Sequence, residues 1–362
     1  METAGSGSRE RLDSVQLLRA IAAIDIVVFH TPFYALIGSW GVTLFFVISG
    51  FIVCYVTETT GVHFMQKRIL RIVPLYWAGT LCVFGIALAM PSLVQNTTTD
   101  VGSLLKSLAF IPFYKGQIIQ PVLFLGWTLN FEMFFYLLFA ISVRLSHRYR
   151  AVICSVLIIG IVVAGQLFSV DVVVWRFFTQ PIILDFILGM FCFTVLKATG
   201  FGRSHRRRFA SKVAFTGLGT AFLVSMPLSI GQGSGATNLT PGVAGGIELG
   251  ILSALALCSF VYGLSGVVLP RPVVLIGDAS YSLYLFHPYV IQLFGKVFRA
   301  FDSDTTAAHL SGLLAIVLCC VLAVLLYRYV ERPVTRYLRR RLLSEGGRRS
   351  SGLPRPGGVD AR

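Results

Sequence analysis

The sequence contains few charged residues, and the two signs are unequally represented. Only 13% of its 362 residues are Asp, Glu, Lys or Arg, against about 25% in soluble domains. Acidic residues number 16 and basic residues 31, which gives a formal net charge of +15. Hydrophobic residues make up 55% of the chain. This composition excludes an ordinary soluble protein and indicates a polytopic membrane protein.

Cysteine motifs are also lacking. The seven cysteines show no CxxC spacing, and each lies within an apolar run. Cysteines in such surroundings behave as small buried hydrophobic side chains. We therefore predict neither a disulfide framework nor a metal site.

Apolar runs recur from residue 16 to residue 330 with short polar gaps. A hydrocarbon core needs about 20 apolar residues per helix, which predicts an all-α integral membrane protein with ten transmembrane helices. The predicted spans are 16–36, 40–57, 69–90, 122–144, 151–169, 175–196, 210–230, 243–267, 274–298 and 310–330. The first lacks a cleavage pattern and is expected to stay as a signal anchor. The apolar stretch 104–113 is too short to span and is expected to be re-entrant or interfacial.

The basic residues fall mainly on one side of this topology. Ten spans place both termini on the same side, and 25 of the 31 Lys and Arg residues lie there. The positive-inside rule assigns that side to the cytoplasm. The charge is therefore attributed to topology, and no nucleic-acid partner is predicted.

Three segments follow from this pattern. They are a cytoplasmic tail at 1–15, a transmembrane domain at 16–335, and a basic cytoplasmic tail at 336–362 that is expected to be disordered. The basic clusters 203–208 and 336–349 could hold anionic lipid or a polyphosphate, but a stop-transfer role is the favoured interpretation.

Ionisable residues inside a membrane are costly and are functional candidates by default. The predicted spans contain Arg19, Asp25, His30, Glu132, Asp185, Glu248 and His287. On one helix, Arg19 and His30 would point only about 20° apart and be separated by about 16.5 Å along the axis. An arginine entrance leading to a buried imidazole suits a ligand with an anionic head and a thin arm, such as an acyl coenzyme A. Asp25 would point about 140° away from His30 and is expected to pair with another helix.

A histidine in a dry site can act as a general base near neutral pH. Hydrogen bonding across helices is the alternative role for His30. Arg68 and Arg71 share a helical face just before the third span, and their guanidinium groups either bind phosphate or serve only topology.

The fourth span carries Glu132 among aromatic residues. This carboxylate could orient His30, bind a sugar hydroxyl, or pair with a cation such as Arg176. In the second span, Ser49 and its glycine neighbour favour close helix packing. His287 precedes a proline that either opens a polar pocket or only kinks the helix.

Taken together, the motifs resemble the acyltransferase-3 family of membrane O-acyltransferases, most closely its bacterial exopolysaccharide O-acetyltransferase branch. The resemblance rests on their order along residues 12 to about 335. The motifs are Leu12-Asp13 through Arg19 to His30, Phe45-Phe46-x-x-Ser49-Gly50, Arg68-x-x-Arg71 with Pro74 and Tyr76, Gly126-Trp127-Thr128-Leu129 with Glu132 and Tyr136, Ser280-Tyr281 through His287, and Glu331-x-Pro333.

The resemblance implies ten spans and transfer of an acyl group from cytoplasmic acyl-CoA to a hydroxyl acceptor. It implies His30 as the catalytic residue, with Glu132 in the catalytic cavity, and Arg19, Arg68 and Arg71 near the CoA phosphates. Candidate substrate-binding residues are Trp127, Tyr136, Ser49 and His287. Asp25 departs from the family pattern.

We therefore predict an acyl-CoA-dependent O-acyltransferase of the bacterial inner membrane, with acetyl-CoA or another short acyl-CoA as donor and no metal. Its acceptor would be a sugar hydroxyl of an exopolysaccharide or lipid-linked glycan, and membrane lipids and polysaccharide-synthesis machinery are candidate partners. His30 would act as general base or as transient acyl carrier. The alternative is a glycan transporter or flippase in which intramembrane His and Glu relay protons, although the chain lacks the internal repeats typical of transporters.

Overall fold

Helices account for nearly all of the regular structure in the computed structural model, which describes residues 12–31, 40–93, 97–116, 118–199, 209–231, 243–297 and 305–350. The helices are α1 Asp13–Phe29, α2 Gly41–Val56, α3 Phe64–Ala89, α4 Val101–Leu108, α5 Gly126–Leu145, α6 Arg150–Leu167, α7 Val173–Phe178, α8 Asp185–Ala198, α9 Phe209–Gly231, α10 Val243–Gly263, α11 Arg271–Asp278, α12 Ser280–Val297, α13 Thr305–Leu326 and α14 Arg332–Ser350. A two-stranded antiparallel ribbon pairs β1 Tyr114–Lys115 with β2 Ile118–Ile119.

Six of the described helical segments are long and apolar enough to cross a membrane. They are Phe64–Ala89, Gly126–Leu145, Arg150–Leu167, Pro181–Ala198, Gly246–Gly263 and Leu310–Leu342. Each overlaps a predicted span, and α2 is a shorter apolar helix. The chain is thus an all-α membrane protein, while the count of ten spans and the cytoplasmic termini stay predictions.

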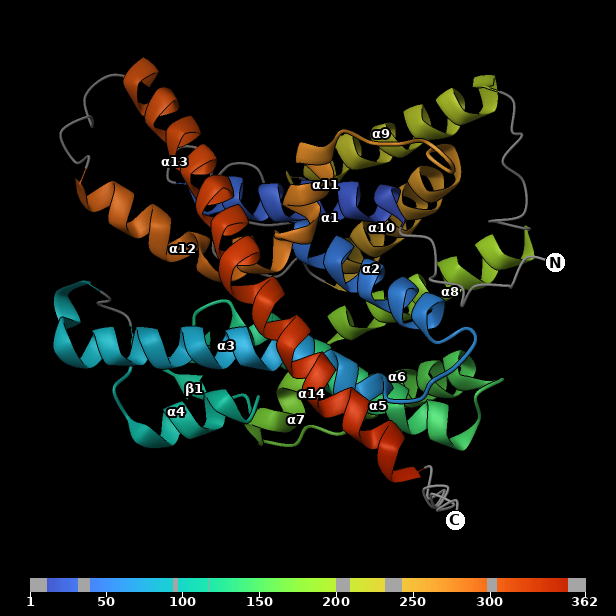
Figure 1. Ribbon diagram of the computed structural model, residues 1–362, viewed down its shortest axis with the longest axis horizontal. Coiled ribbons are helices and arrows are strands. Elements are labelled where there is room, and N and C mark those ends of the chain that lie inside the picture. The colour runs from blue at the N-terminus through green and yellow to red at the C-terminus, as the bar shows by residue number, and fades with distance from the viewer. Residues whose placement is uncertain are drawn as a thin grey trace, which may run out of the picture.

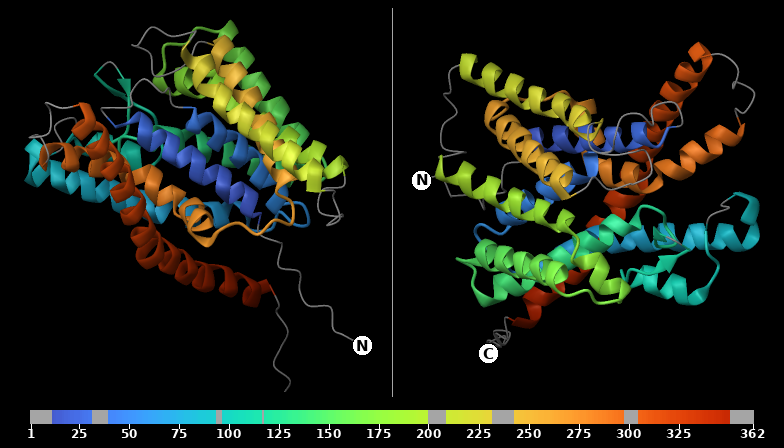
Figure 2. Two further views of the ribbon diagram at one scale, coloured as in Figure 1. Left: turned by 90° about the horizontal axis from the view of Figure 1, so that it is seen from above. Right: turned by 180° about the vertical axis from the view of Figure 1, so that it is seen from behind.

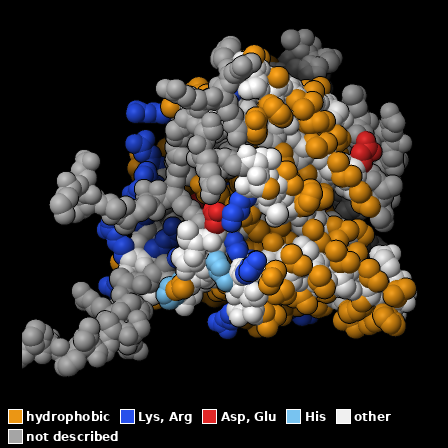
Figure 3. Space-filling model, turned by 90° about the vertical axis from the view of Figure 1, so that its right-hand side faces the viewer, with side chains coloured by type: hydrophobic (Ala, Val, Ile, Leu, Met, Phe, Trp, Pro, Cys, Tyr) orange, Lys and Arg blue, Asp and Glu red, His pale blue; other side chains and the backbone are white. Residues whose placement is uncertain are grey.

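The surface of α6 has the apolar character expected of a helix that contacts lipid. Val152, Val156, Ile159 and Val163 recur at helical spacing and are 47–63% exposed. An apolar stripe of this kind is stable against hydrocarbon and unfavourable in water. On the side of the molecule drawn in Figure 3, hydrophobic side chains cover much of the right-hand part, and basic side chains gather toward the left.

Helix α1 lies in the interior of the bundle and packs against α2, α10, α11, α12 and α13. Figures 1 and 2 show α12 and α13 diverging from each other, while α14 crosses the molecule beside α3. The first turn of α1 and the last turn of α14 lie toward the same, right-hand side of Figure 1. This arrangement brings α1, α2, α3, α5 and α12 around one interior space.

The crossing of α2 and α8 is a close backbone contact. A Cβ atom at Gly50 would lie 2.1 Å from the carbonyl oxygen of Phe186, and one at Gly189 would lie 1.9 Å from that of Val47. Only glycine allows backbones to approach this closely. The expected close packing beside Ser49 is therefore present, and Gly50 provides it.

Two predicted spans are interrupted. The segment 175–196 contains α7, a 3-10 turn that begins at Pro181, and α8. Proline fixes φ and lacks an amide donor, so a new helical segment begins there. The segment 274–298 is divided between α11 and α12, which meet at Ala279.

The basic tail also differs from expectation. A π-helical turn at Tyr327–Glu331 joins α13 to α14, which continues as a helix to Ser350. The prediction that the tail is disordered from residue 336 is therefore wrong for residues 336–350. Pro333 lies in the first turn of α14, where a missing amide costs little, so nothing in the sequence stops the helix earlier. Residues 351–362 lie outside the described part.

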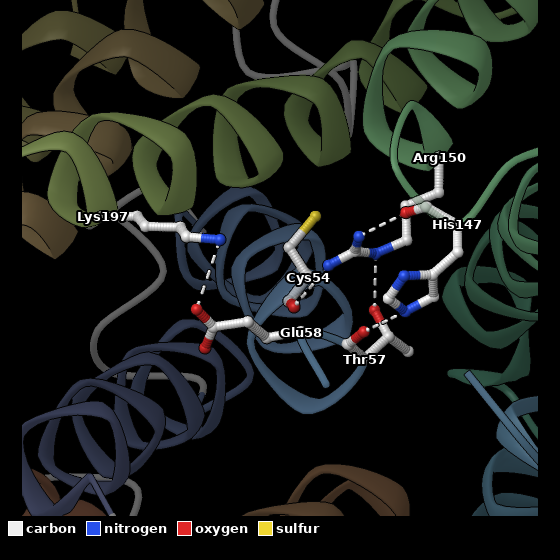
Figure 4. A network of polar contacts seen from close by, with 6 residues as sticks. All are labelled: Cys54, Thr57, Glu58, His147, Arg150 and Lys197. Carbon is white, nitrogen blue, oxygen red and sulfur yellow. Dashed lines mark hydrogen bonds and ion pairs between the residues drawn. The ribbon is translucent and has the colours of Figure 1, made fainter. Parts of the chain in front are cut away.

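Both ends of α2 are held by polar side chains. At its start, the backbone N–H of Gly41 donates to Asp25 Oδ2 at 2.9 Å. At its end, Arg150 Nε donates to Thr57 Oγ1 at 2.9 Å, and His147 Nε2 donates to the Thr57 carbonyl at 2.8 Å (Figure 4). An acid at the N-terminus and a cation at the C-terminus complement the helix dipole. These contacts confirm that Asp25 pairs with another helix.

Candidate active site

A pocket among α1, α2, α3, α5 and α12 brings together six of the nine predicted site residues. These are Arg19, Ser49, Arg68, Arg71, Glu132 and Tyr136. The pocket wall also contains apolar side chains from α2 and α3, among them Phe45, Ile52 and Ile72. His30, Trp127 and His287 do not line this pocket.

The carboxylate of Glu132 accepts two hydrogen bonds in the pocket. Ser49 Oγ donates to Glu132 Oε1 at 3.0 Å, and the Tyr136 hydroxyl donates a short hydrogen bond to the same oxygen. Within the described residues, no hydrogen bond or ion pair joins Glu132 to His30 or to Arg176, and Arg176 pairs with Asp171 instead. Ser49 therefore contributes a polar contact to the site in addition to helix packing.

Three guanidinium groups face this pocket. Arg19 and Arg68 are 8% and 7% exposed, and the Arg68 guanidinium lies over the rings of Phe64 and Tyr136 at 5.5 and 5.3 Å from their centres. None of Arg19, Arg68 and Arg71 makes a hydrogen bond or ion pair to another described residue, although Glu132 and Glu331 attract them at longer range. Burying cations without acceptors is unfavourable unless a ligand supplies anionic oxygens.

A second group forms where α1 ends. His30 follows Phe29 directly and contacts the ring of His287 on α12, with centroids 5.0 Å apart. His287 Nε2 lies 3.4 Å from His30 Nδ1, and His30 Nδ1 lies 2.7 Å from the carbonyl oxygen of Ile26. The ring of Phe124 packs edge-on against His30 at 5.8 Å. The imidazole is thus partly buried, contacts the rings of Phe29, Phe124 and His287, and is held at one nitrogen.

Tyr284 links this histidine pair to the pocket. Its ring lines the pocket and lies 6.4 Å from the ring of His287. Its hydroxyl forms a 2.6 Å hydrogen bond with Thr128 Oγ1. The two ends of the expected ligand path along α1 are therefore separated by Tyr284. Arg19 lies in the pocket on one side of this ring, and His30 lies on the other side.

The chain matches the family model described as an acyltransferase domain over residues 12–328. The protein is a member of the acyltransferase-3 family. It is 34% identical over 319 residues to the exopolysaccharide production protein ExoZ of Rhizobium meliloti, covering 86% of this chain and 93% of that protein. No solved structure matches the chain.

Two more distant relatives also align along most of this acyltransferase. The O-acetyltransferase OatA of Staphylococcus aureus is 23% identical over 345 residues, which cover 88% of this chain and 56% of OatA. The acyltransferase MdmB of Streptomyces mycarofaciens is 25% identical over 376 residues, which cover 91% of this chain and 93% of MdmB. Membership in the family and these names support O-acyltransferase activity in a membrane.

Four polar side chains of the pocket were not among the predicted site residues, although three of them are named in the quoted family motifs. Thr128, Ser280, Tyr281 and Tyr284 line the pocket. A signal for two of them existed, because Tyr281, Tyr284 and His287 are spaced three residues apart and so share one side of a helix. That spacing identifies a polar stripe but not the helix it faces.

A second cavity of about 540 Å³ lies between α12 and α13. Its wall is mainly apolar, and His287 forms part of it. His287 therefore lies between His30 and this cavity. The ring of Trp127 contacts Phe131 at 6.3 Å, so its substrate-binding role stays a prediction. Within the described ranges, no cluster of three His, Cys, Asp or Glu side chains could hold a metal ion.

Proposed function

We propose that this acyltransferase moves an acetyl or other short acyl group from cytoplasmic acyl-CoA to a sugar hydroxyl of an exopolysaccharide or lipid-linked glycan in the bacterial inner membrane. The observation that carries the proposal is the convergence of three arginines, which have no hydrogen-bond or ion-pair acceptor among the described residues, on a pocket bordered by Tyr284 next to the histidine pair. The name of ExoZ supports an exopolysaccharide acceptor.

The arginines would bind the phosphates of the donor. Guanidinium groups form bidentate, charge-assisted bonds with phosphate oxygens. Arg68 is oriented by its two aromatic neighbours, and Arg19 is fixed within the buried helix α1. The apolar wall of the pocket would accommodate the thin arm of the donor and exclude water from the thioester.

His30 would be the general base. The carbonyl oxygen of Ile26 can only accept, so His30 Nδ1 carries the hydrogen in this contact and Nε2 has the free lone pair. As the acceptor O–H bond breaks, its proton moves to His30 Nε2 and the oxygen bonds to the thioester carbonyl carbon. The C–S bond then breaks, and the proton passes from His30 to the departing sulfur to give free CoA.

A covalent route uses the same nitrogen. His30 Nε2 would bond to the thioester carbonyl carbon as the C–S bond breaks and CoA leaves as the thiolate. The acceptor oxygen would then bond to the acyl carbon as the N–C bond breaks, and the acceptor proton would pass to the CoA sulfur. Incubation with labelled acetyl-CoA in the absence of acceptor separates the two routes. A label bound to His30 selects the acyl carrier, and its absence selects the general base.

The proposal is tested with purified protein, labelled acetyl-CoA and crude polysaccharide. Transfer is expected for the wild type, and His30→Ala should lower it by about 10²- to 10⁴-fold, the range of general-base catalysis. His63→Asn is the matched control because His63 is exposed and has a φ of 57° that asparagine tolerates. Full transfer by His30→Ala would refute the assignment of the base.

A transporter predicts a different result. Its product would be unmodified glycan on the opposite side of a vesicle membrane, with no label transferred from acetyl-CoA. Transport without acyl transfer by wild-type protein would replace the proposed acyltransferase reaction with the transporter hypothesis.

A further inference from the structure

His287 makes contacts that a substrate-binding residue would not need. It is 1% exposed, and its Nδ1 lies 3.0 Å from the carbonyl oxygen of Leu283 one turn earlier in α12. Its Nε2 faces His30 Nδ1 at 3.4 Å, although the two residues are 257 positions apart in sequence. Both ring nitrogens are thus directed at protein atoms.

The two carbonyl groups fix where the hydrogens lie. Carbonyl oxygens only accept hydrogen bonds, so Nδ1 carries the hydrogen in His287 as well as in His30. His287 Nε2 then has a free lone pair, and the His30 Nδ1–H group is shared between it and the carbonyl of Ile26. One consistent set of tautomers connects α1 to α12.

We propose that His287 is a positioning residue for His30, holding its Nδ1–H and ring plane so that Nε2 stays unprotonated and directed at the substrates. This inference rests on the proposed role of His30 as base or acyl carrier. It replaces the expectation that His287 binds substrate directly.

The contact would gain strength during the reaction. When His30 Nε2 takes a proton or an acyl group, the ring becomes positively charged and its Nδ1–H a stronger donor. His287 Nε2 is a neutral acceptor and adds no second charge to the buried site. Ile26 belongs to α1, at whose C-terminal end His30 lies, whereas His287 belongs to α12, so His287 also fixes the ring relative to a second helix.

Three substitutions separate positioning from packing. In His287→Gln, the side-chain oxygen can take the place of Nε2 and still accept from His30. In His287→Asn, the shorter amide can still donate to Leu283 but does not reach His30, and His287→Leu fills space without polar atoms. Positioning predicts that Gln stays within about threefold of wild-type kcat while Asn and Leu lose about 10- to 100-fold, as for other supporting contacts.

Kinetic constants and CoA affinity then show which step each His287 variant impairs. The KM values for acetyl-CoA and acceptor should change less than about twofold, and CoA should bind each purified variant with wild-type affinity. Equal kcat for Asn and Gln would show a packing role and overturn the inference. A raised acceptor KM with unchanged kcat would show direct substrate binding and overturn it too.

The same experiment separates this inference from the proposed function. If His30→Ala keeps wild-type transfer, the proposed role of His30 fails whatever the His287 variants do. If His30→Ala is inactive and His287→Leu keeps full kcat, only the positioning role is wrong.

Discussion

Buried arginines occur in two regions of this protein, and their partners differ. At the end of α2, Arg150 donates from Nε to Thr57 Oγ1 at 2.9 Å, from Nη1 to the His147 carbonyl at 2.6 Å and from Nη2 to the Cys54 carbonyl at 3.4 Å (Figure 4). In the pocket, Arg19 and Arg68 have no such acceptors among the described residues. The protein itself satisfies Arg150, whereas the pocket arginines have donors available for the anionic ligand that the proposed function requires.

The largest effect is expected from removing two pocket cations. In Arg68→Gln with Arg71→Gln, each lost charge-assisted bond should cost about 1.5–3 kcal/mol, so the Kd for CoA should rise by about 10²- to 10⁴-fold. Titration calorimetry of the detergent-solubilised protein measures this change. Thermal stability should stay close to that of the wild type, because no described acceptor loses its donor.

Arg148→Gln is the matched control for this double variant, because Arg148 is an exposed arginine on the predicted cytoplasmic side. It should leave CoA affinity within about twofold, since exposed charges are screened by water and salt. An equal loss of affinity in the control would mean that general positive charge, and not the pocket, attracts the donor.

Arg150→Leu should have the opposite profile. The substitution leaves the acceptors of Thr57, His147 and Cys54 without their donor in a buried site, which should lower the free energy of unfolding by about 2–4 kcal/mol. Thermal unfolding in detergent measures the loss. The Kd for CoA of the folded fraction should not change, and a parallel loss of affinity would contradict the division between the two regions.

Sequence could predict the pocket arginines but not the role of Arg150. Arg68 and Arg71 share a face through local helical spacing, and Arg19 follows from its place within an apolar run. Arg150 resembles its neighbours Arg144 and Arg148 in sequence. Its role depends on Thr57, which is 93 residues away, and no periodicity within α6 contains that contact.

The same limit applies to the fold and the histidines. Hydropathy predicted the six segments that are long and apolar enough to cross a membrane, because a bilayer requires a similar length of each span. It did not predict the interruption at Pro181 or the continuation of α14. The helical spacing in α1 correctly predicted that Asp25 points away from His30 and bonds to another helix. It could not predict the contact of His30 with His287, because that contact arises from packing between α1 and α12.

Two hydroxyl groups allow a test, with smaller expected effects, of the same comparison between the pocket and the end of α2. Ser49 donates to the pocket carboxylate Glu132, and Thr57 bonds to both Val53 and Arg150 at the end of α2. Ser49→Ala should lower kcat/KM by about 3- to 10-fold, equivalent to roughly 0.5–1.5 kcal/mol, with little change in stability. Thr57→Val should lower the unfolding temperature with little change in kcat/KM.

Parallel assays of activity and thermal unfolding decide the result for this hydroxyl pair. If Ser49→Ala loses stability and keeps full activity, Ser49 serves helix packing alone, as its position beside Gly50 first indicated. If Thr57→Val loses activity at full stability, the end of α2 takes part in the reaction.

The smallest effect is expected at the ion pair beside Arg150. Lys197 Nζ lies 3.3 Å from Glu58 Oε1, and the two side chains are 60% and 35% exposed. Lys197→Ala should therefore change the free energy of unfolding by less than about 1 kcal/mol, and added salt should reduce the difference further. Unfolding temperatures at low and high salt measure both effects. A loss as large as that of Arg150→Leu would mean that charge, and not the satisfied hydrogen bonds of a buried guanidinium, holds this end of α2.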